Sequence, residues 1–208
     1  MDLLQQIVER AKADKQRIVL PEALEERTLR AADRVLADDI ADIILIGNPT
    51  EIQKMAEARA LKNIDKATII DPENNPKSEE YASLLAELRK KKGMTLEQAL
   101  ELMDNELYFG MMMVQCGDAD SLITGIYSNY GYLSNVARDT VGIAPGHQHF
   151  ATMHLVMMKS GPLFLADTLI NQNLKAETLV DIALLAAEKV RCFGIKPVIA
   201  MVSFSDFG

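Results

Sequence analysis

The sequence contains no tryptophan, and aromatic residues make up only 5% of its 208 residues. Surfaces that stack the bases of single-stranded nucleic acid depend on aromatic side chains, so this composition argues against such a surface. Basic residues are also in the minority: the chain has 22 lysines and arginines but 30 aspartates and glutamates, which gives a formal net charge of −8. Since nucleic-acid binding favours a basic protein, we expect no nucleic-acid partner.

Cysteine is scarce, and long hydrophobic runs are missing. The two cysteines, Cys116 and Cys192, are far apart and form no Cys-x-x-Cys pair, so we predict free buried thiols in a reducing compartment. No apolar run reaches the roughly 18 residues of a membrane span. The N-terminus opens an amphipathic stretch rather than a signal peptide. We therefore expect a cytoplasmic protein with no membrane contact.

Hydrophobic residues make up 49% of the chain, enough for a core. Over the first 72 residues, helical periodicity alternates with short β-branched runs that end in turn residues. The predicted elements are a helix at 2–14, a strand at 17–22, a helix at 25–38, a strand at 42–49, a helix at 50–60 capped by Thr50, and a strand at 68–72. Continuous apolar strands between helices are typical of parallel sheets covered on both faces, so we predict an α/β fold.

The remaining sequence predicts further elements and a second domain. They are a helix at 78–91, a helix with a Thr95/Gln98 capping box, a helix at 105–117, a strand at 121–125, a hairpin of 151–158 with 163–167, a helix at 176–193 and a buried strand at 197–203. The composition shifts at 141–146, so we predict an N-terminal α/β domain at 1–144 and a second α/β domain starting at 145–208. Since the last strand lacks a following helix, we expect this second domain to be incomplete.

One loop is a candidate for binding chemistry. Thr124, Gly125 and Ser128 follow the predicted strand at 121–125, and parallel sheets bind ligands at the carboxyl ends of their strands. Arg138 offers a planar guanidinium that suits phosphate. An ordinary polar loop, with Arg138 on a solvated helix face, gives the same pattern. Without a P-loop spacing, residue types alone favour that ordinary interpretation.

Three other groups carry weaker signals. Asp167 and Asn171 follow a strand, and Ser203 and Ser205 end the last one, but turn and cap chemistry accounts for both groups. Three histidines lie close in sequence, at His147, His149 and His154, without neighbouring carboxylates. We therefore predict no metal site.

Segments along the whole chain, in their order and spacing, resemble the phosphate acetyltransferase (phosphotransacetylase) family. They lie at 7–11, 18–22, 27–32, 41–48, 88–97, 117–125, 164–168 and 181–183. The resemblance implies two α/β domains with a cleft between them, a homodimer, and reversible acetyl transfer between coenzyme A and phosphate. The implied substrates are acetyl-CoA, phosphate and acetyl phosphate. No metal and no cofactor is implied, since coenzyme A is a substrate.

The resemblance also implies roles for residues. Substrate binding falls to Thr124, Gly125, Ser128, Arg138, Asn171, Ser203 and Ser205. Arg89 is expected to reach the phosphates of coenzyme A. The family's catalytic base and main arginine are expected beyond Gly208, so we predict little or no transferase activity from these 208 residues alone.

The sequence departs from the family in one loop. The position at which the family usually has an arginine falls near Asn135 here, and the arginine appears instead at Arg138. The loop at 127–130 and the ending at 203–208 resemble the phosphotransacetylase-like domain of bacterial malic enzymes. That branch implies an alternative, a non-catalytic domain that senses acetyl-CoA or acetyl phosphate. Phosphate butyryltransferase, which shares the fold, is a second alternative.

Overall fold

The computed structural model describes residues 3–172 and 174–202. The chain divides into two compact units, Met1–Gly142 and Ile143–Gly208. The boundary predicted from composition, between residues 144 and 145, lies two residues further along the chain. Each unit has its own sheet, and each is described separately below.

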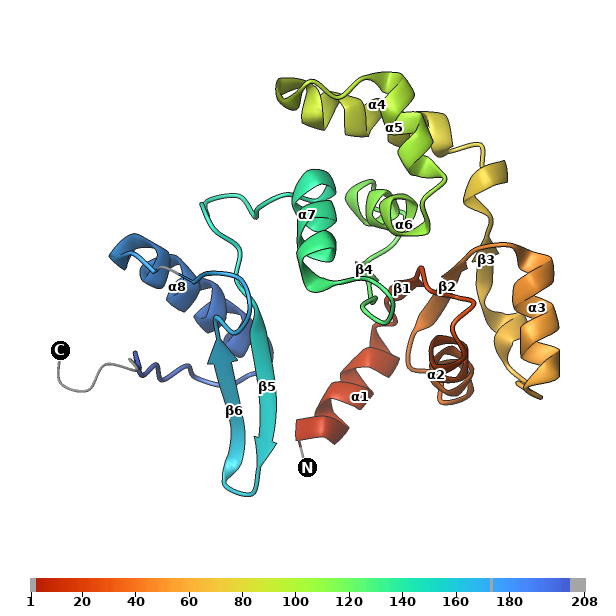
Figure 1. The fold of residues 1–208 in the computed structure, drawn as a ribbon. Helices are drawn as coiled ribbons and strands as arrows, with labels where there is room; N and C mark the ends of the chain where they lie inside the picture. Colours follow the sequence, from red (N-terminus) through yellow and green to blue (C-terminus); the bar gives the residue numbers. More distant parts are fainter. Residues whose placement is uncertain (1–2, 173, 203–208) are drawn as a thin grey trace. The chain divides into compact units, whose positions relative to one another are not determined.

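The first unit is built on a parallel sheet of four strands. Its order is β3 (Thr68–Ile70), β2 (Asp42–Ile46), β1 (Arg17–Leu20) and β4 (Ser121–Leu122), as Figure 1 shows. Every neighbouring pair runs parallel, with Val19 of β1 opposite Ile44 on one side and Leu122 on the other. The predicted α/β fold with a parallel sheet is confirmed.

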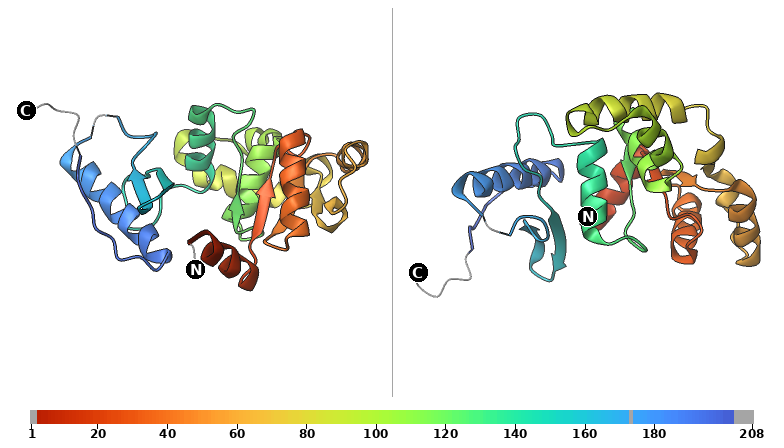
Figure 2. Two further views of the ribbon diagram at one scale, coloured as in Figure 1. Left: turned by 90° about the horizontal axis from the view of Figure 1, so that it is seen from below. Right: turned by 45° about the horizontal axis from the view of Figure 1, so that its top comes forward.

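Side chains of β2 alternate between two hydrophobic cores. Ile43 and Leu45 pack with α2 (Glu26–Ala37) and α3 (Pro49–Ala58), whereas Ile44 and Ile46 belong to the core on the opposite face. That opposite core is formed by α4 (Ser78–Arg89), α5 (Leu96–Met103), α6 (Glu106–Gln115) and α7 (Tyr130–Thr140). Figure 2 shows the helices on either side of the sheet. Burial on both faces explains why the strands read as uninterrupted apolar runs.

A glycine lets α6 approach the sheet closely. A Cβ atom on Gly110 would lie 2.8 Å from Leu122 Cδ1 and 2.9 Å from Val19 Cγ1. These separations are shorter than real Cβ contacts, so a larger residue would push the helix off β1 and β4. Gly110 therefore sets the distance between helix and sheet.

Local cap chemistry sets where several helices begin. Thr95 and Gln98 form the predicted capping box at α5, which is confirmed. At α3 the prediction was wrong, because Asn48 rather than Thr50 is the cap; its Oδ1 accepts from the N–H groups of Thr50 and Glu51. Pro49 then occupies the first helical turn, where its missing N–H costs nothing.

The sequence prediction missed α7 and overextended β4. Asn129 caps α7 by accepting from the Tyr132 N–H at 2.9 Å, and the helix buries Val136 and Thr140. The capping residue and the apolar positions along 133–140 were a usable signal. The strand predicted at 121–125 ends at Leu122, because the chain turns at the sheet edge to enter the loop before α7.

The other predicted helices of this unit are present. The first, α1 (Leu3–Ala13), contains no buried residue. Short 3-10 turns lie at η1 (Ile64–Lys66), η2 (Pro72–Asn74) and η3 (Lys90–Lys92). Among the described helices, none is long and apolar enough to cross a membrane.

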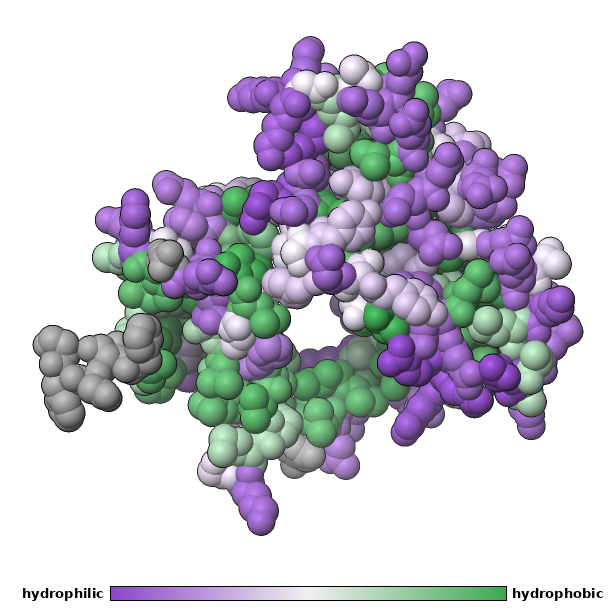
Figure 3. Space-filling view, in the orientation of Figure 1, coloured by the Kyte–Doolittle hydropathy of each residue, from purple (hydrophilic) through white to green (hydrophobic). Residues whose placement is uncertain are grey.

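The described part of the second unit consists of an antiparallel hairpin and one helix. Strands β5 (Met153–Met158) and β6 (Gly161–Ala166) pair as predicted, and α8 (Ala176–Cys192) follows. The rings of Phe164 and Phe193 lie 5.4 Å apart and join the hairpin to the end of the helix. Figure 3 shows hydrophobic side chains gathered over β5 and β6.

Two predictions for this unit were wrong. Residues 197–202 form no strand, and Val198 and Val202 are each 93% exposed, because no described strand lies beside this segment to take its backbone hydrogen bonds. Residue 203 of the predicted strand lies outside the described residues. Cys116 and Cys192 form no disulfide within the described residues, but the prediction that both thiols are buried was wrong, since Cys192 is exposed and Cys116 only half-buried.

Candidate functional site

Because all four strands of the first unit run parallel, their carboxyl ends share one edge of the sheet. The chain leaves β1 through Pro21 and Glu22, β2 through Gly47 and Asn48, and β4 into a loop that begins at Ile123. This edge is where open parallel sheets bind ligands. The predicted residues Thr124, Gly125 and Ser128 all lie on the loop at this edge.

The carboxylate of Glu22 holds that loop through its backbone. It accepts from the N–H of Gly125 at 3.1 Å, of Ile126 at 3.0 and 3.1 Å, and of Tyr127 at 2.8 Å. The Thr124 side chain adds a further hydrogen bond. Gly125 has a φ of +129°, a conformation that side chains disfavour. The glycine therefore permits the turn that aims consecutive amides at one carboxylate.

These hydrogen bonds keep Glu22 ionised. Partial burial favours its neutral form, but the donors from Tyr127, Ile126, Gly125 and Thr124 outweigh burial and lower the pKa of Glu22. The sequence prediction did not identify Glu22 as a site residue. Glu22 lies in the 18–22 segment, and no local pattern links it to amides more than 100 positions away.

A second carboxylate, Glu106 in the first turn of α6, lies near the same edge. A Cβ on Gly47 would lie 3.3 Å from Glu106 Oε1, so the carboxylate approaches the backbone at the end of β2 closely. Burial raises the pKa of Glu106, and the negative charge of Glu22 raises it further. The edge therefore combines a readily ionised acid with one that resists ionisation, an asymmetry found at functional sites.

Ser128 lies between the Glu22-bound amides and the start of α7. Ser128 is half-buried, whereas the neighbouring Tyr127 is 72% exposed. The next residue, Asn129, caps the helix. Helix N-termini carry unpaired N–H groups and a positive end of the helix dipole, which favour anions.

The structure does not bring Arg138 to this loop. Arg138 lies in the last turn of α7, eight residues after Tyr130. With a rise of 1.5 Å per residue, that separation is about 12 Å along the helix axis. Thr124, Gly125 and Ser128 are thus grouped by the structure, whereas Arg138 lies at the other end of the helix.

Arg89 is also away from the loop, in an ion pair between α4 and α7. Its Nη2 lies 2.5 Å from Asp139 Oδ1, and its side chain is only 12% exposed. The Nε atom is buried and has no hydrogen-bond partner among the described residues. Lys92 approaches Asp139 to 4.0 Å, and Lys90 and Lys91 are exposed beside it. These residues form a cationic cluster: Arg89, Lys90, Lys91 and Lys92.

In the second unit, Asn171 takes part in a clamp around Asp167. The Asp167 carboxylate accepts from the N–H and hydroxyl of Thr152 and from the N–H and Nδ2 of Asn171, at 2.5–2.9 Å. Burial opposes ionisation, but the hydrogen bonds from Thr152 and Asn171 lower the pKa of Asp167 to about 2. Asn171 Nδ2 also donates to the Phe150 carbonyl. Ser203 and Ser205 lie outside the described residues.

A carboxylate that was not anticipated from the sequence joins two of the histidines. Asp181 of α8 lies 2.6 Å from His147 Nδ1 and 3.3 Å from His149 Nδ1, and also accepts from the N–H groups of Gln148 and His149. Hydrogen bonds from His147 and from these amides lower the pKa of Asp181. Across residues 3–172 and 174–202, no group of three or more His, Cys, Asp and Glu is placed to hold a metal.

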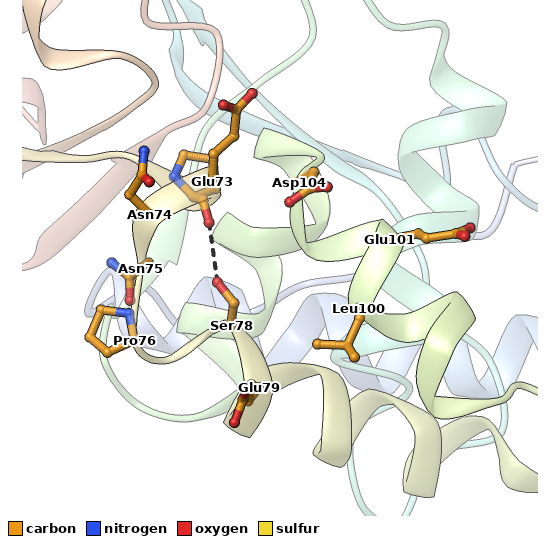
Figure 4. A pocket seen from close by; sticks show the side chains of 10 residues that line it. Glu73, Asn74, Asn75, Pro76, Ser78, Glu79, Leu100, Glu101 and Asp104 are labelled. Atoms are coloured by element: carbon orange, nitrogen blue, oxygen red, sulfur yellow. Dashed lines mark hydrogen bonds between the residues drawn. The ribbon is translucent and has the colours of Figure 1, made fainter.

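An open pocket of the first unit, with a volume of about 660 Å³, has an acidic lining. Glu73, Glu101 and Asp104 surround it, and the Ser78 hydroxyl donates to the Pro72 carbonyl at 3.1 Å (Figure 4). Its negative charge makes it unsuitable for phosphate. None of the residues predicted to bind substrate lines this pocket.

The fold is that of an α/β protein whose polar loop at 123–128 lies at the carboxyl ends of parallel strands. Residues 2–208 match the family model described as phosphate acetyl/butaryl transferase, and the chain belongs to that family.

Individual relatives agree with this assignment. The chain is 40% identical to the phosphate acetyltransferase of Thermoanaerobacterium thermosaccharolyticum, with 100% of this chain and 65% of the relative covered. A solved phosphotransacetylase structure from Streptococcus pyogenes superposes with a TM-score of 0.91 and 30% identity, covering 99% of this chain and 63% of that one. The NADP-dependent malic enzyme of Salmonella typhimurium is 36% identical over 97% of this chain and 27% of its own length. The chain thus spans just under two thirds of the two phosphotransacetylases.

Proposed function

We propose that the protein acts in the reversible transfer of an acetyl group between coenzyme A and inorganic phosphate. The observation that carries this proposal is the agreement with a phosphotransacetylase structure over 99% of the chain, at a TM-score of 0.91. The loop at the sheet edge also supports it, because it leads through Ser128 to the start of α7, and helix N-termini favour anions. We also propose that the protein works in the cytoplasm as a homodimer.

The reaction needs three things from a protein. A phosphate oxygen attacks the thioester carbonyl, the C–S bond of the resulting tetrahedral oxyanion breaks, and the sulfur leaves as the thiolate of coenzyme A. The protein must hold phosphate close to the carbonyl, stabilise the oxyanion and manage the protons of phosphate and thiol. Coenzyme A acts as a substrate, and the proposal includes no metal or cofactor.

We place phosphate or the phosphoryl group of acetyl phosphate at the Ser128 hydroxyl and the first N–H groups of α7. Thr124 and Gly125 contribute by shaping the loop, since the amides of residues 125–127 are already bound to Glu22. Arg138 is left out of direct contact because it lies at the opposite end of α7. Asn171 is assigned an indirect role, because its amide group is bound to Asp167 and the Phe150 carbonyl.

We place the phosphates of coenzyme A at the cationic cluster Arg89, Lys90, Lys91 and Lys92. Arginine forms planar paired hydrogen bonds with phosphate, and the lysines add charge at the end of α4. Because Arg89 already forms an ion pair with Asp139, a phosphate of coenzyme A would compete with that carboxylate for the guanidinium.

Isothermal calorimetry with phosphate, acetyl phosphate and coenzyme A tests the proposal. We expect each to bind the 208-residue chain, with little or no acetyl phosphate-dependent formation of acetyl-CoA. If none of the three binds, the proposed function is wrong. Enzyme-like turnover would instead overturn the expectation that the catalytic base lies beyond Gly208.

Similarity to malic enzymes supports a second candidate, a domain that binds acetyl-CoA or acetyl phosphate without turnover. Sequencing the gene beyond Gly208 separates the candidates. A Ser-Arg pair and an aspartate in that region would favour the enzyme, and their absence would favour the sensor.

A competition series with acetyl-CoA and butyryl-CoA tests the butyryltransferase alternative, which predicts tighter binding of the longer acyl chain.

A further inference from the structure

Glu22 occupies an unusual position for a side chain at a ligand-binding edge. Its carboxylate receives the N–H groups of three consecutive loop residues, Gly125, Ile126 and Tyr127, at 2.8–3.1 Å. Consecutive amides converging on one anion form the kind of concavity that binds phosphate in other proteins. Here the protein supplies its own anion, from a residue 103–105 positions earlier in the chain.

Both ends of this interaction are anchored in the sheet. Glu22 follows β1 directly after the buried Pro21, and the loop follows β4, which pairs with β1. The Ile123 N–H donates to the Val19 carbonyl at 2.9 Å, which extends the contact between the two segments to the start of the loop. The Glu22 carboxylate therefore fixes the loop backbone relative to the sheet.

The loop leads directly to the proposed phosphate contacts. Tyr127 is the last residue whose amide binds Glu22, Ser128 comes next, and Asn129 caps α7. The position of the Ser128 hydroxyl relative to the helix N-terminus therefore depends on the backbone that Glu22 holds.

We propose that Glu22 is a positioning residue, whose carboxylate fixes the loop at 124–127 so that Ser128 and the start of α7 together receive phosphate or acetyl phosphate. This inference rests on the proposed function for its ligand. Glu22 itself touches no ligand, because its oxygens are turned to the loop amides.

The charged and titratable groups around Glu22 come from three other segments. Glu106 of α6 and Arg27 of α2 interact with it electrostatically, and Tyr127 lies on the loop itself. Among these, Glu22 alone accepts hydrogen bonds from the loop amides. Titration of Glu22 should therefore be visible at those amides directly.

The first measurement is an NMR pH titration of the 208-residue chain, comparing wild type with Glu22→Gln. In the wild type, the amide signals of Gly125, Ile126 and Tyr127 are expected to move together, with a midpoint below the usual range for glutamate. In Glu22→Gln this shared transition should disappear. Glu51→Gln, which removes an exposed carboxylate from the first turn of α3, serves as the matched control and should leave it unchanged.

The second measurement is the affinity for inorganic phosphate and acetyl phosphate. We expect Glu22→Gln to weaken binding at least fivefold, Glu22→Asp to recover part of the loss, and Glu51→Gln to bind as the wild type does. Equal or tighter binding by Glu22→Gln would overturn the inference. Tighter binding would mean that the Glu22 carboxylate competes with phosphate for the loop amides, which become available to phosphate once the charge is removed. If the wild type shows the amide transition but binds neither ligand, the proposed function fails and Glu22 is only a structural clamp.

Discussion

Replacing Gly110 with alanine is expected to destabilise the first unit by about 1–2 kcal/mol. The added Cβ would meet Leu122 Cδ1 at 2.8 Å and Val19 Cγ1 at 2.9 Å, both inside the core between α6 and the sheet. Overpacking of a core costs about 1–3 kcal/mol, and two simultaneous clashes place this site in the upper half of that range. Alanine returns up to about 1 kcal/mol through its higher helix propensity, which leaves a net loss.

Tyrosine fluorescence during urea unfolding measures this change selectively. The chain has no tryptophan, and its five tyrosines lie at positions 81, 108, 127, 130 and 132, all within the first unit. The signal therefore follows this unit without a contribution from the second. Gly131→Ala in α7 is a matched control, since the nearest atom to its Cβ lies at an ordinary 3.4 Å. We expect that variant to be as stable as the wild type or slightly more stable.

A Gly110→Ala protein with unchanged or higher stability would refute the reasoning. It would mean that α6 moves away from β1 and β4 without loss of packing. In that case the close approach of the helix would not be what requires glycine at this position.

Three further predictions concern ligands and pH. Ser128→Ala should weaken phosphate binding roughly tenfold, about 1.4 kcal/mol, in calorimetry; an equal loss in Arg138→Ala would contradict the placement of Arg138 outside the site. The double variant Lys90→Gln, Lys91→Gln should weaken coenzyme A binding severalfold at low salt and less at high salt. If the loss of affinity did not depend on salt, the cationic cluster would be excluded as the binding site of the coenzyme A phosphates. Because the pKa of Asp167 is lowered to about 2 from 3.8, its contribution to stability is present above pH 4 and is lost as the pH falls towards 2. Hydrogen exchange of β5 and β6 amides should follow that loss, and Asp167→Asn should be less stable at pH 6 but lack this part of the pH dependence.

Local sequence patterns were sufficient to predict most elements. Apolar β-branched runs predicted β1, β2 and β3, and the turn around Lys159–Pro162 predicted the pairing of β5 with β6. The capping box of Thr95 and Gln98 was readable because its two partners are three residues apart. These features depend on residues that are close together in the chain, so both interaction partners can be identified from a short stretch of sequence.

The contacts at the candidate site depend on tertiary structure. Glu22 meets the amides of residues 125–127 because β1 and β4 pair, Arg89 meets Asp139 because α4 packs on α7, and Asp181 meets His147 because α8 packs near that turn. A carboxylate accepts any suitable donor, so residue type alone does not specify its partner. The sequence by itself determined most of the elements and the position of a polar loop at 124–128. Only the tertiary structure decided that this loop is held by Glu22 and that Arg138 is remote from it, because strand pairing and helix packing bring together residues that no local pattern connects.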